Sequence, residues 1–239
     1  FLGILLQADS GKIYAGGEFY VNSAQPSNLR HVAAFDATSG ELDSAWNPPV
    51  SGVVYSLAIG TGRLYVGGLG VATIGGGPRQ NLVALELANG TNTGQLDPVW
   101  NPQPDRPVWV VLPYGGKVYA GGEFFQVNGG VSRAFLAAFA PADGTNTGAM
   151  DAAWRPQYSS VVRGLAVIEG CLYAAGGDLV PYNLADGHSP AKSLAVAGRG
   201  SMMPEHEIAT VATSDQELFL GLHGWDGDPS YLESRGPGP

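Results

Sequence analysis

The sequence predicts an all-β protein built from about five copies of one unit. A glycine-centred segment, KIYAGGEF at 12–19, returns as RLYVGGLG at 63–70 and as KVYAGGEF at 117–124. It returns in altered form as CLYAAGGD at 171–178 and ELFLGLHG at 217–224. The aromatic residue of the segment recurs after 51, 54, 54 and 46 residues, at Tyr14, Tyr65, Tyr119, Tyr173 and Phe219. A period of this length indicates one supersecondary unit copied in series.

Each unit contains short apolar runs bounded by Gly, Asp, Asn, Ser and Pro, a pattern typical of strands. The first two runs of a unit are joined by DSGK, TGR, YGGK or EGC, where Gly supplies the positive φ of a tight turn. A third apolar run follows the glycine segment. We therefore expect antiparallel hairpins that begin near Leu5, Leu57, Val110, Leu165 and Ala209.

A second segment closes each of the first three units. It reads LDSAWNPPV around Trp46, LDPVWNPQP around Trp100 and MDAAWRPQY around Trp154. The three tryptophans are 54 residues apart, so we expect them to be equivalent, buried anchors. The segment itself is expected to supply a short fourth strand.

Four antiparallel strands about every fifty residues are typical of a β-propeller blade. The sequence predicts a single propeller domain over 1–239, of about five four-stranded blades with the last one or two degenerate, or a five-unit part of a larger propeller. The expected units are 1–50, 51–105, 106–158, 159–205 and 206–239. Because the fourth unit lacks the tryptophan closure and the fifth stops early, either the last blade is short or the residues belong to a longer chain. An incomplete last blade would permit self-association.

Composition argues against several classes of partner. The formal charge of −9, with only 12 Lys and Arg residues, argues against binding to nucleic acid or to an anionic membrane surface. No apolar run approaches the roughly 18 residues of a membrane span, so no membrane insertion is expected. Cys171 is the one cysteine, which excludes an internal disulfide. Its place in an apolar run predicts a small buried hydrophobe.

The order of an apolar run, the segment GKIYAGGEF, a run ending in FDATSG and the closure LDSAWNP resembles the bacterial delta-60 repeat. That family forms propellers and has no assigned function. The resemblance covers residues 1 to 157 well and the last two units poorly. It implies a secreted or surface-attached bacterial protein. The closing Trp departs from the family, which more often carries Phe there.

The segment AFDATSGELDSAW also resembles the tryptophan-docking segment of quinoprotein dehydrogenases. Ser39 stands where Thr is expected, and Trp46 lies six residues past Gly40 instead of four. Those enzymes use an eight-bladed ring, a calcium ion and, in many members, a vicinal cysteine pair. This chain is too short for that ring and has one cysteine, so we expect no quinone cofactor.

Motifs of catalytic and metal sites are absent from the sequence. The histidines lie in different units, and none has a partner at metal-ligand spacing. Asp226 and Asp228 lack the further acidic residues of a calcium loop and are expected to form a turn. No G-x-S-x-G nucleophile elbow occurs. We therefore expect no catalytic residue, no metal and no cofactor, and a chain that is not an enzyme.

A recurring polar set follows the glycine segment and is our predicted ligand site. Its members are Glu18, Asn22 and Arg30 in the first unit and Glu123, Asn128 and Arg133 in the third, while the second unit keeps only Arg79 and Asn81. Loops at one end of a propeller commonly carry such sites, here as one weak pocket per blade. In the alternative, Glu and Arg pair within a blade and Asn caps a turn. Aromatic residues that could either stack on sugar rings or pack between blades are Tyr20, Phe125, Tyr182 and Trp225.

Three classes of function remain. The favoured one is a non-catalytic binding or scaffold module, secreted or at the cell surface, because nearly identical units carry no unique catalytic cluster. Its ligand is a glycan or a protein, and the acidic balance favours a neutral or cationic one. The alternatives are a glycan-processing propeller enzyme with paired carboxylates and a structural subunit of a larger assembly.

Overall fold

The computed structural model describes residues 5–20, 29–73, 79–190, 206–214, 217–224 and 232–235. These residues form strands, turns and loops. No helix occurs among them, and hence none that could cross a membrane. The prediction of an all-β protein is confirmed for this part of the chain.

The described strands form five three-stranded antiparallel sheets, each from one stretch of the chain, and one two-stranded ribbon. The first two sheets contain β1 (Leu5–Asp9), β2 (Lys12–Tyr20) and β3 (Leu29–Asp36), then β4 (Val50–Gly60), β5 (Arg63–Thr73) and β6 (Leu82–Glu86). The third contains β7 (Val108–Tyr114), β8 (Lys117–Gly122) and β11 (Leu136–Phe139). The last two contain β12 (Val162–Ile168), β13 (Cys171–Gly176) and β14 (Leu179–Asn183), then β15 (His206–Ser214), β16 (Glu217–Gly224) and β17 (Leu232–Arg235). A separate two-stranded ribbon, β9 (Gln126–Val127) with β10 (Val131–Ser132), stands between β8 and β11.

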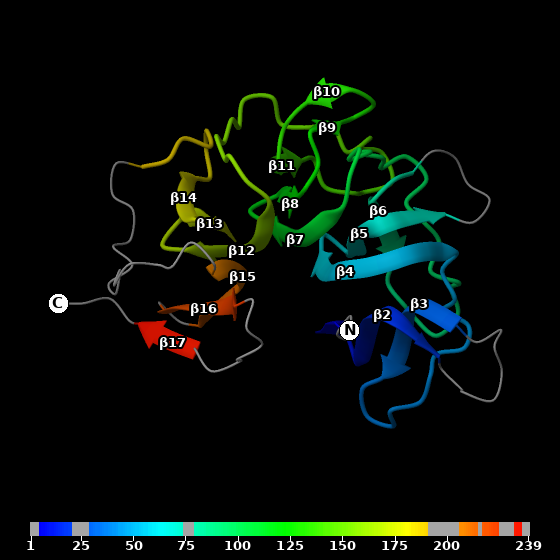
Figure 1. The fold of residues 1–239 in the computed structure, drawn as a ribbon. Coiled ribbons are helices and arrows are strands. Elements are labelled where there is room, and N and C mark those ends of the chain that lie inside the picture. The colour runs from blue at the N-terminus through cyan, green and yellow to red at the C-terminus, as the bar shows by residue number, and fades with distance from the viewer. Residues whose placement is uncertain are drawn as a thin grey trace.

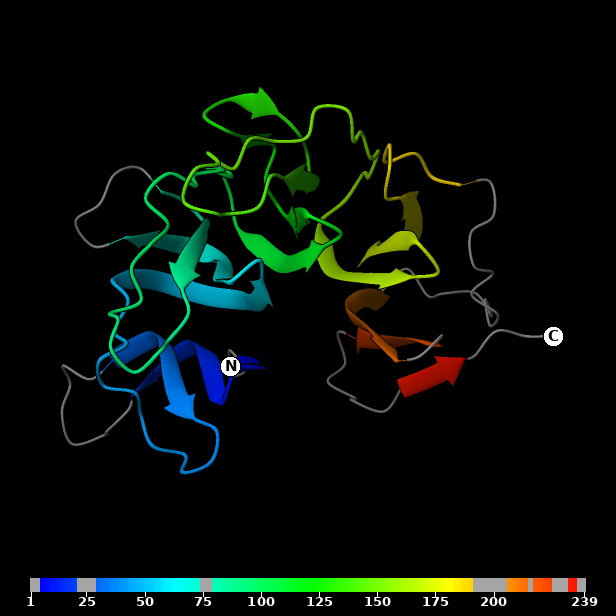
Figure 2. The same ribbon diagram turned by 180° about the vertical axis from the view of Figure 1, so that it is seen from behind.

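The sheets follow one another along an arc. Figures 1 and 2 show the sheet of β1, β2 and β3 at one end of the arc and the sheet of β15, β16 and β17 at the other. The first strand of each sheet lies toward the middle of the arc and the third strand toward the outside (Figure 1). First strands of consecutive sheets contact one another: β1 contacts β4, β4 contacts β7, β7 contacts β12, and β12 contacts β15.

The hairpins predicted near Leu5, Leu57, Val110, Leu165 and Ala209 are confirmed as antiparallel pairs. The first four close with two-residue turns in which both residues have positive φ: Ser10-Gly11, Thr61-Gly62, Gly115-Gly116 and Glu169-Gly170. Two consecutive positive φ angles define the type I′ turn, whose twist matches that of the two strands. The glycine of each turn is therefore the reason that the chain reverses there.

The hydrophobic core lies between consecutive sheets. Trp46, Trp100 and Trp154 are each fully buried, which confirms the predicted anchors. Each packs edge-on against the aromatic residue of its own glycine segment, with ring centroids 5.3, 5.2 and 5.1 Å apart in the pairs Tyr14–Trp46, Tyr65–Trp100 and Tyr119–Trp154. Each anchor also packs against residues of the following sheet, such as Val66 for Trp46 and Val108 for Trp100. The anchors thus join one unit to the next.

Among the described residues, the expected fourth strand of each unit is wrong. The closing segment makes a single β-bridge to the third strand, in the pairs Phe35–Leu42, Leu85–Leu96 and Phe139–Met150. The next residue in each unit is Asp43, Asp97 or Asp151, and its carboxylate accepts the backbone N–H of the anchor three residues later. This side-chain hydrogen bond turns the chain away from the sheet after one bridge.

Candidate functional site: a ladder of bulge residues

The two glycines of the repeated segment have different structural roles. A Cβ on Gly67 or Gly121, the first of the pair, would lie 2.9 or 2.4 Å from the side chain of Val108 or Val162 in the next sheet. The absence of a side chain therefore lets neighbouring sheets approach closely. A Cβ on Gly68, the second of the pair, would lie 1.9 Å from the Val53 carbonyl oxygen in the partner strand. Only glycine fits there without a shift of the backbone.

This close backbone approach coincides with a β-bulge that recurs in the first strand of four sheets. In β4 the pairing register jumps between Val54 and Ser56, so that Tyr55 is the additional residue. The same jump leaves Trp109 unpaired in β7, Arg163 in β12 and Ala209 in β15. Bulges re-aim a side chain and are concentrated next to functional sites. The fold therefore places one residue at an equivalent position in each of these four sheets.

The bulge residues of three consecutive sheets stack on one another. The rings of Tyr55 and Trp109 are parallel, with centroids 4.1 Å apart and an angle of 4° between their planes. The guanidinium carbon of Arg163 lies 4.7 Å from the centroid of the Trp109 ring, in a cation–π contact. All three side chains are half-buried. We call Tyr55, Trp109 and Arg163 the bulge ladder.

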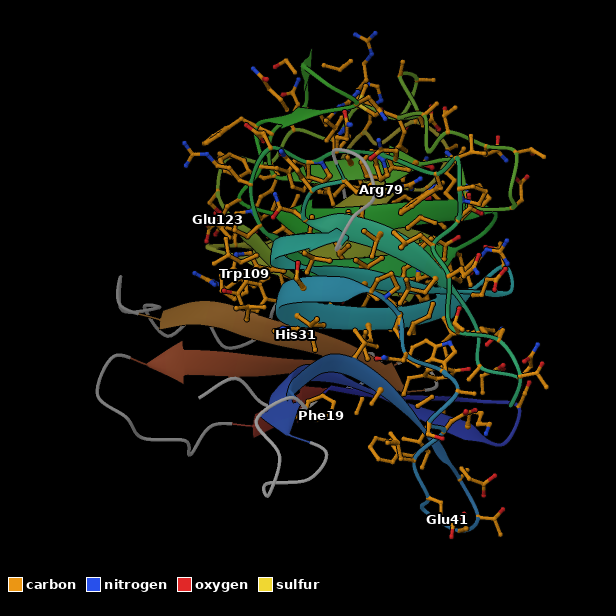
Figure 3. All side chains as sticks on the ribbon, turned by 90° about the vertical axis from the view of Figure 1, so that its right-hand side faces the viewer. Phe19, His31, Glu41, Arg79, Trp109 and Glu123 are labelled. Carbon is orange, nitrogen blue, oxygen red and sulfur yellow. The ribbon has the colours of Figure 1, made fainter. Side chains whose placement is uncertain are left out.

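A carboxylate lies at the edge of the bulge ladder. Oε1 of Glu123 accepts a 2.9 Å hydrogen bond from the indole N–H of Trp109. Burial, and then the charge of Glu123, raise the pKa of Tyr55. Figure 3 shows Glu123 beside Trp109 and far from Glu41, which lies at the opposite end of the molecule.

Backbone and side-chain contacts fix the geometry of this site. The hydroxyl of Ser56, the neighbour of Tyr55, is buried and accepts a 2.9 Å hydrogen bond from the backbone N–H of Val111 in β7. The backbone N–H of Glu123 donates to the carbonyl of Pro107 at 3.0 Å. Both ring faces of Trp109 are covered, by Tyr55 and by Arg163. A ligand would therefore meet the ring edges and the carboxylate of Glu123, which can accept hydrogen bonds from hydroxyl or ammonium groups.

Among the members of the predicted ligand site whose side chains the structure describes, Glu123 lies at the bulge ladder. Asn128 instead joins two loops: its Nδ2 donates to the Gly148 carbonyl at 3.0 Å, and its Oδ1 accepts from the Met150 N–H at 2.9 Å. The guanidinium of Arg133 donates to the carbonyl of Trp154 at 2.7 Å. Asn128 therefore has the turn-fixing contacts of the alternative interpretation, whereas Glu123 bonds Trp109 instead of pairing with Arg133.

The second unit repeats these contacts with Arg79 and Asn81. Arg79 donates to the carbonyl of Trp100, as Arg133 does to that of Trp154. Asn81 is buried, accepts from the Gly70 N–H at 2.8 Å and donates to the Pro104 carbonyl at 2.9 Å. Arg79 and Asn81 therefore connect loops of the second unit through hydrogen bonds to backbone groups.

The first-unit members of the predicted site lie partly outside the described residues. Glu18 is in β2 and Arg30 in β3, but their side chains, like that of Tyr20, are outside the described part of the structure. Asn22 and Trp225 lie wholly outside it. Of the other aromatic residues singled out, Tyr182 is buried in the core, and its hydroxyl donates to the Gln157 carbonyl, whereas Phe125 is exposed.

Sequence reasoning missed Tyr55, Trp109 and Arg163. They are 54 residues apart, the same interval that separates Trp46, Trp100 and Trp154, so their equivalence was visible in the sequence. Within the described residues, the structure holds no group of three or more His, Cys, Asp or Glu side chains placed to bind a metal ion.

No family model and no curated protein matches the chain. Among solved structures, it is similar to the computationally designed Ika8 protein, with a TM-score of 0.53 and 11% sequence identity. The match covers 96% of this chain and 56% of the Ika8 chain, so this chain spans little more than half of the Ika8 length. The computationally designed Ika4 protein matches with a TM-score of 0.49 and 13% identity, over 79% of this chain and 93% of that one. At these identities the likeness concerns the fold alone.

Proposed function

We propose that the chain is a β-propeller of five blades, or a five-blade part of a larger one, and that it acts as a non-catalytic binding module. Support for the propeller comes from the arc of three-stranded sheets with contacting first strands, together with the recurring period of the sequence. The resemblance to the delta-60 repeat adds the expectation of a secreted or surface-attached protein.

The bulge ladder is the observation that carries the binding proposal. Three units build the same framework, with the same two-residue turns and a double glycine or its close equivalent, yet the bulge position holds Tyr55, Trp109 and Arg163. The backbone is thus the same in the three units while the side chain at the bulge differs, which is the arrangement expected of a surface that binds a ligand. Aromatic surface with a few fixed polar groups is typical of small-ligand sites. The ligand that fits best is a neutral glycan, whose C–H groups contact the ring edges and whose hydroxyls donate to Glu123.

A neutral-glycan array, followed by titration of the retained glycan, tests this proposal. Glu123→Gln keeps the shape of the side chain and removes its charge, and we expect it to weaken binding by about tenfold, the effect of losing a hydrogen bond to a charged acceptor. Glu41→Gln, at the opposite end of the molecule (Figure 3), is the matched control and should bind as the unmodified chain does.

Glu18→Ala and Glu123→Ala, singly and together, test whether the first unit contributes an equivalent site. If no neutral glycan is retained, or if the Glu123 variants bind it unchanged, the proposal is wrong. Release of reducing sugar from a retained glycan would favour the glycan-processing alternative instead.

A further inference from the structure

The third unit carries an exposed aromatic cluster beside the ribbon of β9 and β10. Phe125 is 43% exposed and Val131 is 45% exposed, although both are large and apolar. The ring of Phe125 packs edge-on against Phe135, with centroids 5.2 Å apart. The guanidinium of Arg106 lies 5.0 Å from the centroid of the Phe125 ring. Apolar surface of this kind, next to a cation, is typical of places where another molecule binds.

The backbone that presents this cluster is strained. Phe135 has a φ of 64°, a left-handed conformation that is rare for a bulky residue. The equivalent residue of the second unit is Asn81, with a φ of 62°, and Asn tolerates this conformation far better. Phe135 is partly buried, and its ring packs against the core cluster of Trp154 as well as against Phe125, in a backbone conformation that has an energetic cost. Strain of this kind is concentrated at functional sites.

Two further arginines lie next to the cluster. The backbone N–H of Arg133 donates to the Phe125 carbonyl, and its guanidinium donates to the Trp154 carbonyl. Nε of Arg155 donates to the carbonyl of Ala152 in the same turn. The first two units carry Asn47 and Asn101 where the third carries Arg155, so the third unit alone of these three adds the second cation.

Two carboxylates lie beside this surface, and each has bonding partners other than Arg133 and Arg155. Oδ1 of Asp105 accepts the backbone N–H groups of Phe125 and Gln126. Asp151 is ion-paired with Lys117 at 2.8 Å. Among the described residues, no carboxylate forms an ion pair with Arg133 or Arg155. Burial, and then the charge of Arg155, lower the pKa of Arg133, and the carboxylate of Asp151 acts in the opposite direction without outweighing them.

We propose that this surface, made of Arg106, Phe125, Val131, Arg133, Phe135 and Arg155, binds an acidic segment of a protein partner that also carries apolar side chains. Phe and Arg are enriched in protein–protein interfaces and in their hot spots. The surface gathers cations on a chain whose formal charge is −9, so it selects an acidic partner by charge complementarity. Exposed Phe125 and Val131 favour a polypeptide with apolar side chains over a bare anion.

The test uses a labelled synthetic peptide in which Glu and Phe alternate, with fluorescence anisotropy as the readout. Phe125→Ala and Arg155→Asn are each expected to weaken binding by about tenfold, as interface hot spots do. Arg155→Asn restores the residue that the first two units carry. Tyr114→Ala is the matched control and should leave binding unchanged. Tyr114 is an aromatic residue about as exposed as Phe125, and it lies at the C-terminal end of β7, outside the proposed surface.

Two comparison peptides and one competitor complete the test. A peptide in which Lys and Phe alternate, and one in which Glu and Ser alternate, are both expected to bind at least about tenfold more weakly. Glu123→Gln is expected to leave peptide binding unchanged, so the result is independent of the glycan proposal. Equal binding of the charge-reversed peptide, binding that survives the combined Phe125→Ala and Arg155→Asn change, or full competition by inorganic sulfate at equal concentration would each overturn the inference.

Discussion

The indole nitrogen of Trp46 donates a 2.9 Å hydrogen bond to the carbonyl of Glu86, which lies one unit further along the chain. The same bond recurs from Trp100 to Ala140 at 2.7 Å and from Trp154 to Asn183 at 3.0 Å. Each anchor therefore closes its own unit and donates a hydrogen bond to a backbone carbonyl of the next unit. Stability in such an array depends on the interfaces between neighbouring units as well as on each unit.

Replacing an anchor tests this coupling. Trp100→Ala removes a fully buried indole and is expected to lower the free energy of unfolding by about 3–5 kcal/mol. Trp100→Phe keeps most of the packing but leaves the Ala140 carbonyl without its donor, so a smaller loss of about 1–3 kcal/mol is expected. Urea unfolding measures both, with the exposed neighbour Val99→Ala as the control. A loss below about 1 kcal/mol for Trp100→Ala would mean that the anchor does not hold the two units together.

The first glycine of the repeated pair allows the next sheet to pack closely. A Cβ on Gly121 would lie 2.4 Å from Cγ1 of Val162 in β12, so Gly121→Ala should cost about 1–3 kcal/mol of stability by overpacking. Val162→Ala removes Cγ1 of Val162, the nearest atom that the new Cβ would meet, while Cγ1 of Val110 at 2.9 Å remains. The double variant should therefore be more stable than the sum of the two single losses predicts, a coupling that a double-mutant cycle measures. Simple additivity would show that the glycine is not required for close packing.

Asp97 is expected to make the free energy of unfolding depend on pH in the acidic range. Burial alone would raise the pKa of Asp97, but hydrogen bonds from the amides of Trp100, Val99 and Gly144 and from Arg63 outweigh this effect, so the pKa lies below its usual value. Because the folded pKa is depressed, this stabilisation is fully present above the ordinary Asp pKa of about 4 and is lost as the pH falls through the folded pKa.

Asp97→Asn is therefore expected to lower stability at pH 7 and to flatten its fall below about pH 4, where one proton contributes up to about 1.4 kcal/mol per pH unit. Urea midpoints at a series of pH values measure this slope for the variant and the unmodified chain. Parallel curves for the two proteins would show that Asp97 is not the group that titrates with unfolding. Ion pairs at equivalent places, Lys12–Asp43 and Lys117–Asp151, are expected to leave part of the slope in the variant.

The hairpins and anchors were predictable from sequence because each rests on local chemistry that repeats. A glycine that requires positive φ, as at Gly62, marks a turn wherever it occurs between apolar runs. The fourth strand was not predictable in the same way, because Leu42 and Asp43 resemble the start of a strand. Its loss depends on the Asp43 carboxylate accepting the Trp46 N–H, a competition that apolar patterning does not reveal.

The bulge ladder was harder to predict because a bulge is a property of two strands and not of one. The runs around Tyr55 and Trp109 alternate without an obvious break, and one additional residue changes which side chain faces outward. Glu123 was selected as a loop residue after the glycine segment, and its partner Trp109 comes from the strand before it. Polarity in the sequence therefore identified the carboxylate but not the rings beside it.

Two substitutions of Asn81 separate the energetic cost of its left-handed backbone from the contribution of its buried side-chain hydrogen bonds. Its side chain accepts from the Gly70 N–H and donates to the Pro104 carbonyl, and its own φ is 62°. Asn81→Ala loses both bonds and leaves a Cβ in the left-handed region without the side-chain hydrogen bonds that compensate for it, so we expect a loss of about 2–4 kcal/mol. Asn81→Gly loses the same bonds but tolerates the conformation, and should be less destabilised, by about 1 kcal/mol. Urea unfolding with the exposed neighbour Gln80→Ala as control measures the difference. Equal losses for the two variants would show that the backbone at Asn81 is not strained. If both variants were as stable as the unmodified chain, the side-chain hydrogen bonds of Asn81 would not be holding the loops together.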